Sequence, residues 1–189
     1  MLPHQPVNPR LNDAAQISDF NADSASALIK PPLSELGDQI AQVMSDMPFA
    51  QLCQMRFALE DGQMVGRIDN HAGLIGNLHF KILHGGVAAT LLDTIGGLTS
   101  MFEIYRRDIG TFDEQRQRVQ RIATTDLRID YLAPGRGTAF VATAEIIRMG
   151  RKGCTTRMLL VNQDGTLIAH GMASYTYRTY AKRINFCVS

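Results

Sequence analysis

The sequence predicts an α+β fold in which one long apolar helix packs against an antiparallel sheet of about six strands. Residues 87–105 are rich in small and apolar side chains, and this run is long enough for a buried helix. Six shorter segments have the composition of strands, two before this run and four after it. Turn residues separate most neighbouring segments, as they do in an antiparallel sheet whose strands are joined by hairpins.

The first part of the chain divides into a polar arm and the start of one domain. Residues 1–30 are rich in Asn, Asp, Ser and Pro without a clear period, which predicts an arm or a loosely attached extension. Residues 31–189 are then expected to form a single domain. This domain opens with a short amphipathic helix over residues 33–47, with Pro32 near its start.

A hairpin and a loop lead from this helix to the long one. Residues 53–58 and 64–68 have the composition of strands and flank a turn at residues 60–62, which predicts a hairpin. Residues 71–83 contain two glycines and predict a loop that crosses to the long helix.

The segment after the long helix is dense in charge. Residues 106–121 carry charges of both signs, which predicts a solvated insertion or a lid-like excursion, with a substrate-binding role as the alternative. Residues 123–131 alternate between apolar and polar side chains, as a half-buried antiparallel strand does. Three more strand segments follow at residues 138–148, 155–162 and 166–177, with glycine-containing turns between them.

Composition and charge narrow the class of protein. With 189 residues, 45% of them hydrophobic and 20% charged, the chain can bury a sizeable core. A net charge of +1 gives no reason to expect a nucleic acid or a membrane surface as partner. Residues 1–8 lack the features of a secretory signal, and the apolar runs are short for a membrane span. Cys53, Cys154 and Cys187 form no Cys-x-x-Cys pair, which predicts reduced thiols and a cytoplasmic location.

The candidate chemistry lies in residues 82–97. This segment reads as a loop that ends in His84-Gly85-Gly86, followed by a helix with a single acid, Asp93, in its middle. A lone carboxylate among apolar neighbours is costly to bury, so it is either paired or used in chemistry. The glycines let backbone N–H groups approach a ligand at a helix N-terminus, where negative charge is stabilised. The segment therefore predicts an oxyanion donor site and a base or nucleophile.

The spacing of these two groups predicts a homodimer. If the helix starts near Gly85, Asp93 lies roughly 10–12 Å along the axis from the first amides, at about 1.5 Å per residue. Both groups must sit within about 3 Å of one reacting carbonyl. Two antiparallel copies of the helix, one from each subunit, meet this condition. The neighbours of Asp93 one helical turn away, Ala89, Thr90, Gly96 and Gly97, are small and leave a shallow groove.

The sequence resembles the hotdog-fold acyl-CoA thioesterases of the phenylacetate-pathway (PaaI-like) type over residues 49–177. The strongest match is the HGGV segment that leads to Asp93, and residues 126–134, which end in Tyr-Leu-Ala-Pro, add a second. The resemblance implies a hotdog fold, hydrolysis of acyl-CoA or aryl-CoA thioesters to free acid and CoA, and no metal or other cofactor. The arm and the 106–121 insertion have no counterpart in a minimal member.

The resemblance also implies roles for individual residues. Asp93 matches the catalytic carboxylate, as general base or nucleophile, and the N–H groups around Gly85 would polarise the thioester carbonyl from the facing subunit. Asn77 falls near a polar residue that helps to hold the water or the carbonyl, and Thr124 matches a strand hydroxyl that assists the water. The resemblance further implies substrate contacts at Gly86, Thr90, Arg148, Arg151 and Lys152. The three basic side chains among them are expected to bind the phosphates of CoA.

Each role has a structural alternative. Asp93 could cap or pair across the dimer, and His84 either orients the turn or acts as a base. Asn77 could satisfy its own loop, Thr124 could be an ordinary strand residue, and the basic residues could form a solvated hairpin tip. The histidines follow no usual spacing of metal ligands, so no metal is predicted.

Two other functions remain on the same fold. An enoyl-CoA hydratase or dehydratase would need a histidine paired with an acid, and the histidine motif of those families is not matched. A non-catalytic acyl-CoA-binding protein would have no need of the acid at position 93, and no basic recognition helix for DNA is visible. The acyl group stays open, as does the choice between a homodimer and a dimer of dimers.

Overall fold

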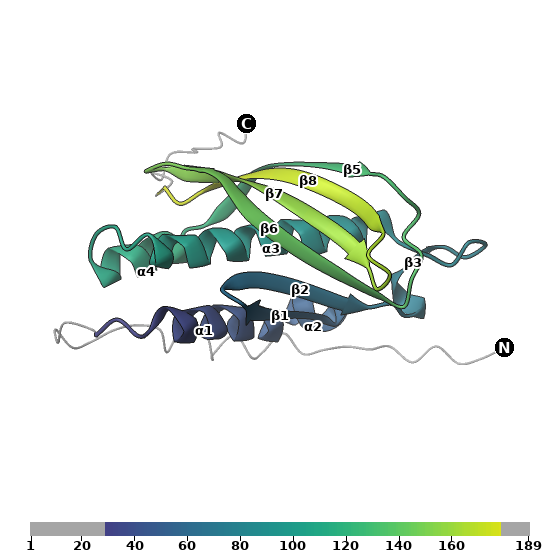
Figure 1. Ribbon diagram of the computed structural model, residues 1–189, viewed down its shortest axis with the longest axis horizontal. Helices are drawn as coiled ribbons and strands as arrows, with labels where there is room; N and C mark the ends of the chain where they lie inside the picture. Colours follow the sequence, from purple (N-terminus) through teal and green to yellow (C-terminus); the bar gives the residue numbers. More distant parts are fainter. Residues whose placement is uncertain (1–28, 179–189) are drawn as a thin grey trace, which may run out of the picture.

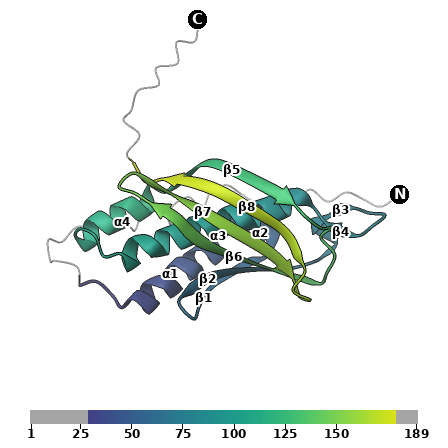
Figure 2. The same ribbon diagram turned by 45° about the horizontal axis from the view of Figure 1, so that its top comes forward.

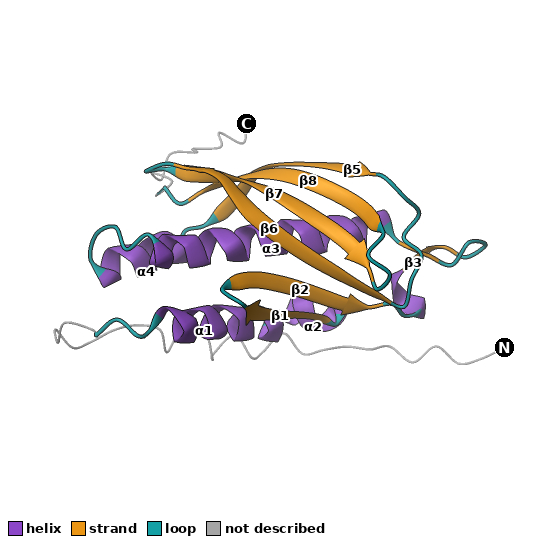
Figure 3. Ribbon diagram, viewed as in Figure 1, coloured by secondary structure: helices purple, strands orange, loops and turns teal. Residues whose placement is uncertain are grey.

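A six-stranded antiparallel sheet curves around one side of the helix α3 (Gly85–Arg106) in the computed structural model, which describes residues 29–178 (Figures 1 and 3). The order in the sheet is β1-β2-β6-β7-β8-β5, and every neighbouring pair is antiparallel. The α+β class with one long helix is therefore confirmed. The strands are β1 (Met55–Glu60), β2 (Gln63–Asp69), β5 (Ala123–Tyr131), β6 (Ala139–Met149), β7 (Gly153–Asn162) and β8 (Leu167–Thr176).

The core lies between α3 and the concave face of the sheet. Side chains of α3 at Leu91, Ile95 and Leu98 are completely buried, and alternate residues of β6 and β7 meet them, among them Phe140 and Leu160. Among residues 29–178, α3 is the one helix with the length and apolar composition of a membrane span. Half of the residues of that helix are buried inside the protein, as expected for the central helix of a core.

The other face of α3 is covered by the helix expected near the start of the domain. This helix is α1 (Leu33–Asp46), which packs on β1 and α3. The contact is close at Gly37, where Leu59 and Phe102 leave no room for a side chain. A short second helix, α2 (Pro48–Cys53), was not foreseen, so Cys53 ends a helix instead of beginning a strand. The hairpin of β1 and β2 is confirmed, with Gly62 at a positive φ of 77° in its turn.

The segment at residues 71–83, expected as a plain loop, contains a small hairpin that fixes the start of α3. Strands β3 (Ile75–Asn77) and β4 (Ile82–Leu83) pair after a short 3-10 turn. The turn between β3 and β4 forms because the side-chain oxygen of Asn77 accepts the amides of His79 and Phe80, both at 3.0 Å. The amide of His84 then donates to the Leu74 carbonyl at 2.8 Å.

Residues 106–121 are mostly exposed, as a solvated insertion would be, but they contain a helix. Arg106 belongs to α3, and residues 112–120 form helix α4 (Phe112–Gln120) against the C-terminal half of α3. The Thr111 hydroxyl and the Glu114 carboxylate cap each other's backbone amides at the helix start. Gln115 is completely buried and donates to Asp108 and to the Gly110 carbonyl. Because the sequence of this segment is dense in charge, its composition did not indicate this buried side of α4.

Strand β5 is present as expected, but it is not half-buried. It lies at the end of the sheet, so β8 is its one neighbour among the described residues. Most of its side chains are exposed, including Leu127, and Tyr131 near its end is 55% exposed. The apolar side chains of its alternating pattern therefore form a face of β5 that the described part of one chain does not cover. The predicted arm, apart from Ile29 and Lys30, lies outside the described residues, as does Cys187.

The capping of α4 gives a direct test of its order. Thr111→Ala removes the N-cap oxygen, so we expect the amides of α4 to exchange with deuterium about fivefold faster, which corresponds to about 1 kcal/mol. Hydrogen exchange followed by mass spectrometry measures this effect. Thr111→Ser keeps the cap and should behave as the parent. Equal exchange in both variants would mean that the cap does not hold α4 in place.

Candidate active site

Asp93 lies on the face of α3 that looks toward β5 and β8, where two hydroxyl groups meet it. The Thr124 hydroxyl, from the edge strand β5, donates to the Asp93 carboxylate at 2.9 Å. The Tyr175 hydroxyl, from β8, lies 2.8 Å from the Asp93 carbonyl and 3.3 Å from its carboxylate. Register brings these two together, because Thr124 and Tyr175 are directly opposite in the β5–β8 pair. The half-buried acid borders a cavity of about 190 Å³.

Tyr175 reaches the helix because Gly96 has no side chain. A Cβ atom at Gly96 would lie 2.3 Å from the Tyr175 hydroxyl and 3.0 Å from that of Thr156. Burial raises the pKa of the Tyr175 phenol, and the neighbouring Asp93 carboxylate raises it further. The phenol therefore stays protonated at neutral pH and acts as a donor toward Asp93.

The N-terminus of α3 holds one unused donor. The Nδ1 atom of His84 accepts the amide of Gly86 at 2.8 Å, so this histidine caps the helix and Gly86 is already bonded. The amide of Gly85, the first residue of the helix, bonds to no other group among residues 29–178. Tyr131 donates to the carbonyl of the same residue, Gly85, at 2.9 Å. A free amide at a helix start is suited to an oxyanion.

The other expected site residues fall into two groups. Thr124 lies beside Asp93 and donates to its carboxylate. Asn77 and Thr90 make local bonds instead, since Asn77 holds its own turn and the Thr90 hydroxyl donates to the Gly86 carbonyl at 2.9 Å. Within residues 29–178, no three side chains of His, Cys, Asp or Glu are grouped as metal ligands would be.

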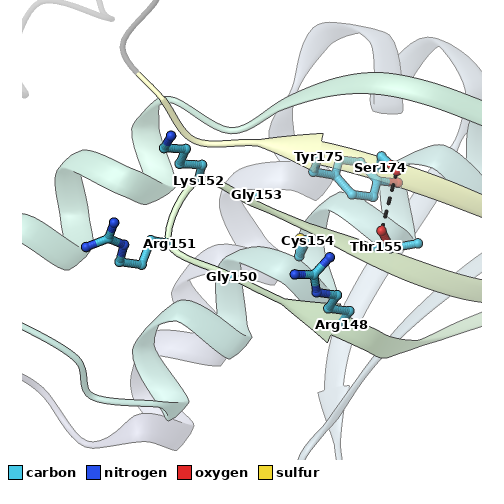
Figure 4. A pocket seen from close by; sticks show the side chains of 9 residues that line it. All are labelled: Arg148, Gly150, Arg151, Lys152, Gly153, Cys154, Thr155, Ser174 and Tyr175. Atoms are coloured by element: carbon cyan, nitrogen blue, oxygen red, sulfur yellow. Dashed lines mark hydrogen bonds between the residues drawn. The ribbon is translucent and has the colours of Figure 1, made fainter.

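The three basic residues expected to bind CoA line one hollow of about 450 Å³ (Figure 4). Arg148 comes from the end of β6, whereas Arg151 and Lys152 come from the loop between β6 and β7. No carboxylate among residues 29–178 lines the hollow. The loop itself is held in place, because the Tyr177 hydroxyl donates to its backbone and the Lys152 carbonyl accepts from β8 and from Tyr177. Tyr175 borders both this hollow and the cavity at Asp93.

An antiparallel sheet wrapped around a central helix, with an acid in the middle of that helix, is the arrangement of a hotdog fold. A sequence model described as the thioesterase superfamily matches residues 80–169, which include Asp93 and Thr124. Because a relative that is 43% identical is also covered over 70% of its own length, the chain belongs to the thioesterase superfamily.

Individual relatives support this assignment. The chain is 43% identical over 108 residues to the medium/long-chain acyl-CoA thioesterase YigI of Salmonella typhimurium, covering 57% of this chain and 70% of that protein. A Shewanella oneidensis protein related to the thioesterase superfamily has a crystal structure with a TM-score of 0.73 and 39% identity. That match covers 79% of this chain and 100% of the other. The Escherichia coli PaaI protein, at 21% identity and a TM-score of 0.59, shares the fold over 77% of this chain and 95% of its own.

Three residues of the site were missed from the sequence. Tyr175 is separated from Asp93 by 82 positions, and strand register alone brings it there. Tyr131 and Gly96 were noticed only as a strand residue and a small residue. A possible signal for Gly96 is its place one helical turn from the acid, where a glycine lowers helix propensity and so calls for a packing reason.

Two neighbouring glycines allow a matched test of the contact between Tyr175 and α3. In Gly96→Ala the new methyl group displaces the phenol, and we expect the free energy of unfolding to fall by about 1–3 kcal/mol. In Gly97→Ala the new Cβ lies 3.5 Å from the Tyr175 ring, an ordinary contact. That variant should be unchanged or more stable by about 0.5–1 kcal/mol through helix propensity. Urea denaturation measures both, and equal effects would contradict the contact.

Proposed function

We propose that this thioesterase hydrolyses acyl-CoA with medium or long acyl groups to the free acid and CoA, and that Asp93 is its catalytic carboxylate. The observation that carries this proposal is the placement of Asp93. Its carboxylate borders a cavity, accepts the Thr124 hydroxyl, and belongs to a helix with an unused amide at its start. The named activity of the Salmonella relative supports acyl-CoA as the substrate class.

The reaction needs a carboxylate and an oxyanion donor. Asp93 either removes a proton from the water that attacks the thioester carbonyl, or attacks that carbonyl to form an anhydride that water then opens. The carbonyl oxygen gains negative charge in both routes, and the Gly85 amide stabilises it. The C–S bond then breaks, the thiolate of CoA leaves and takes up a proton, and the acyl group ends as the free acid. Thr124 orients the carboxylate through its 2.9 Å hydrogen bond.

A homodimer with shared sites follows from the rigidity of α3. Asp93 is eight residues after Gly85, which is about 12 Å along a helix, so one chain cannot bring both to one carbonyl. The outer edge of β5 has no neighbour among the described residues, and apolar Leu127 and Leu132 are exposed near it. Antiparallel pairing of two β5 edges would set the two α3 helices antiparallel. Association of two such dimers stays a prediction.

The remaining expectations fit the same proposal. The hollow lined by Arg148, Arg151 and Lys152 offers charge-assisted bonds to the phosphates of CoA. The free cysteines Cys53 and Cys154 favour the cytoplasm. A hydratase is disfavoured because the Nδ1 atom of His84 already accepts the Gly86 amide, and a binding protein without activity would have no use for Asp93.

The first test is hydrolysis of a panel of acyl-CoAs by the parent and by Asp93→Asn. The asparagine has the shape of the acid but cannot act as a base or nucleophile, so we expect turnover to fall by about 10²–10⁴. Release of free thiol measures the rate, and circular dichroism checks the fold. Asp61→Asn, at an exposed acid in the turn between β1 and β2, is the matched control and should keep full activity. Near-normal hydrolysis by Asp93→Asn would refute the proposed mechanism.

A second test asks whether the sites are shared between subunits. Gly85→Pro removes the free amide at a position where proline suits a helix, and the backbone of His84 (φ −65°, ψ 133°) is compatible with a following proline. We expect a loss of about 10²–10³ in kcat, whereas Gly85→Ala keeps the amide and most of the activity. Both substitutions place a Cβ against the Tyr131 ring.

Mixing inactive subunits completes this test. When Gly85→Pro and Asp93→Asn chains are unfolded and refolded together, half of the dimers are mixed, and each mixed dimer has one of its two sites intact. Shared sites therefore give about one quarter of the parent activity. Sites contained within one chain would give none above the sum of the two variants.

A further inference from the structure

An apolar groove of about 380 Å³ runs between α1, α3 and α4. Its walls include Ile40 and Val43 of α1 and Phe112 and Val119 of α4. The groove is open to solvent in part, since Val43 is 52% exposed. Figures 1 and 2 show α1 and α4 at the same end of α3, away from the β3–β4 hairpin.

The groove continues from the cavity at the catalytic acid. Met44, Met101 and Ile122 line both the cavity that contains Asp93 and the groove. Along α3, Met101 and Tyr105 lie eight and twelve residues beyond Asp93, so at about 100° per residue the lining winds roughly 80° and 120° around the helix axis. The distance from Asp93 to Tyr105 along that axis is about 18 Å. A linear apolar group attached at Asp93 would therefore follow the helix into the groove.

We propose that the groove binds the fatty-acyl chain of the substrate, with the thioester carbonyl at Asp93 and the chain end toward Tyr105 and Phe112. This inference rests on the proposed acyl-CoA thioesterase function and adds the place and the length limit of the acyl group. The groove shares its inner end with the reacting centre, and its length along α3 is that of a medium to long chain. These two features select a substrate chain as the occupant.

The chemistry of the walls fits a linear alkyl group. Two of the methionines, Met44 and Met101, stand where the cavity opens into the groove, and unbranched thioether side chains adapt to chains of different length. At the far end the Tyr105 and Phe112 rings are in contact, with centroids 5.9 Å apart. Helix α4 therefore forms one wall of the groove and supplies part of its end, although it belongs to a segment dense in charge.

Filling the groove tests the proposal. Val43→Trp, on the α1 wall, and Val119→Trp, on the α4 wall, should each lower kcat/KM for palmitoyl-CoA by about tenfold or more, because methylene groups of a long chain lose their apolar contacts. Hydrolysis of hexanoyl-CoA should change by less than about twofold, since a short chain stays near Asp93. Leu52→Trp, at a 75% exposed position of α2 outside the groove, is the matched control and should keep the parent profile.

Binding measurements test the role of the groove independently of the hydrolysis step. In the Asp93→Asn background, calorimetry should show that Val43→Trp weakens palmitoyl-CoA about tenfold and leaves CoA alone unchanged. Equal losses for all acyl lengths, or no loss for palmitoyl-CoA, would overturn the groove proposal. Equal losses are also the result if residues 1–28 of the chain or another protein fill the groove. Failure of the parent to hydrolyse any acyl-CoA would instead overturn the proposed function.

Discussion

The position of Asp93, the proposed catalytic acid, depends on one close approach, that of the Tyr175 phenol to α3 at Gly96. A buried tyrosine hydroxyl needs a hydrogen-bond partner, and here it finds the backbone carbonyl of Asp93 at 2.8 Å. The helix is thereby tied to β8 at the residue that carries the acid. Because Thr124 of β5 is opposite Tyr175 in the sheet, its hydroxyl reaches the same carboxylate. Strand order and the absence of one Cβ atom together place the acid.

A second constraint is the stiffness of the helix that carries both of the proposed catalytic groups. The amide of Gly85 and the carboxylate of Asp93 are held about 12 Å apart, and a packed helix cannot bend to bring them together. The fixed spacing is an obstacle within one chain, but in an antiparallel pair it places each amide beside the other chain's acid. The exposed edge of β5 would then have a catalytic purpose, since its pairing would set the spacing between the helices.

The sequence was a good guide to local structure and a poor guide to long-range contacts. The start of α3 and the β1–β2 hairpin were predictable because capping, glycine turns and apolar periodicity act over a few residues. Tyr175 was not, because its place beside Asp93 depends on the register of β5 and β8. The face of α4 that carries Phe112 and Val119 was hidden by surrounding charges. The burial of β5 was overestimated, since alternation reports an apolar face without saying which chain covers it.

Helix α4 shows how selectivity for substrate length can be separated from catalysis. It packs on α3 beside Met101 and Tyr105, two to three turns beyond Asp93. Its own cap and the hydrogen bonds of the buried Gln115 order its start. A segment with these properties can vary in length and side chains at little cost to the core. In the proposed groove, such variation would move the end wall and thereby change which acyl chains fit.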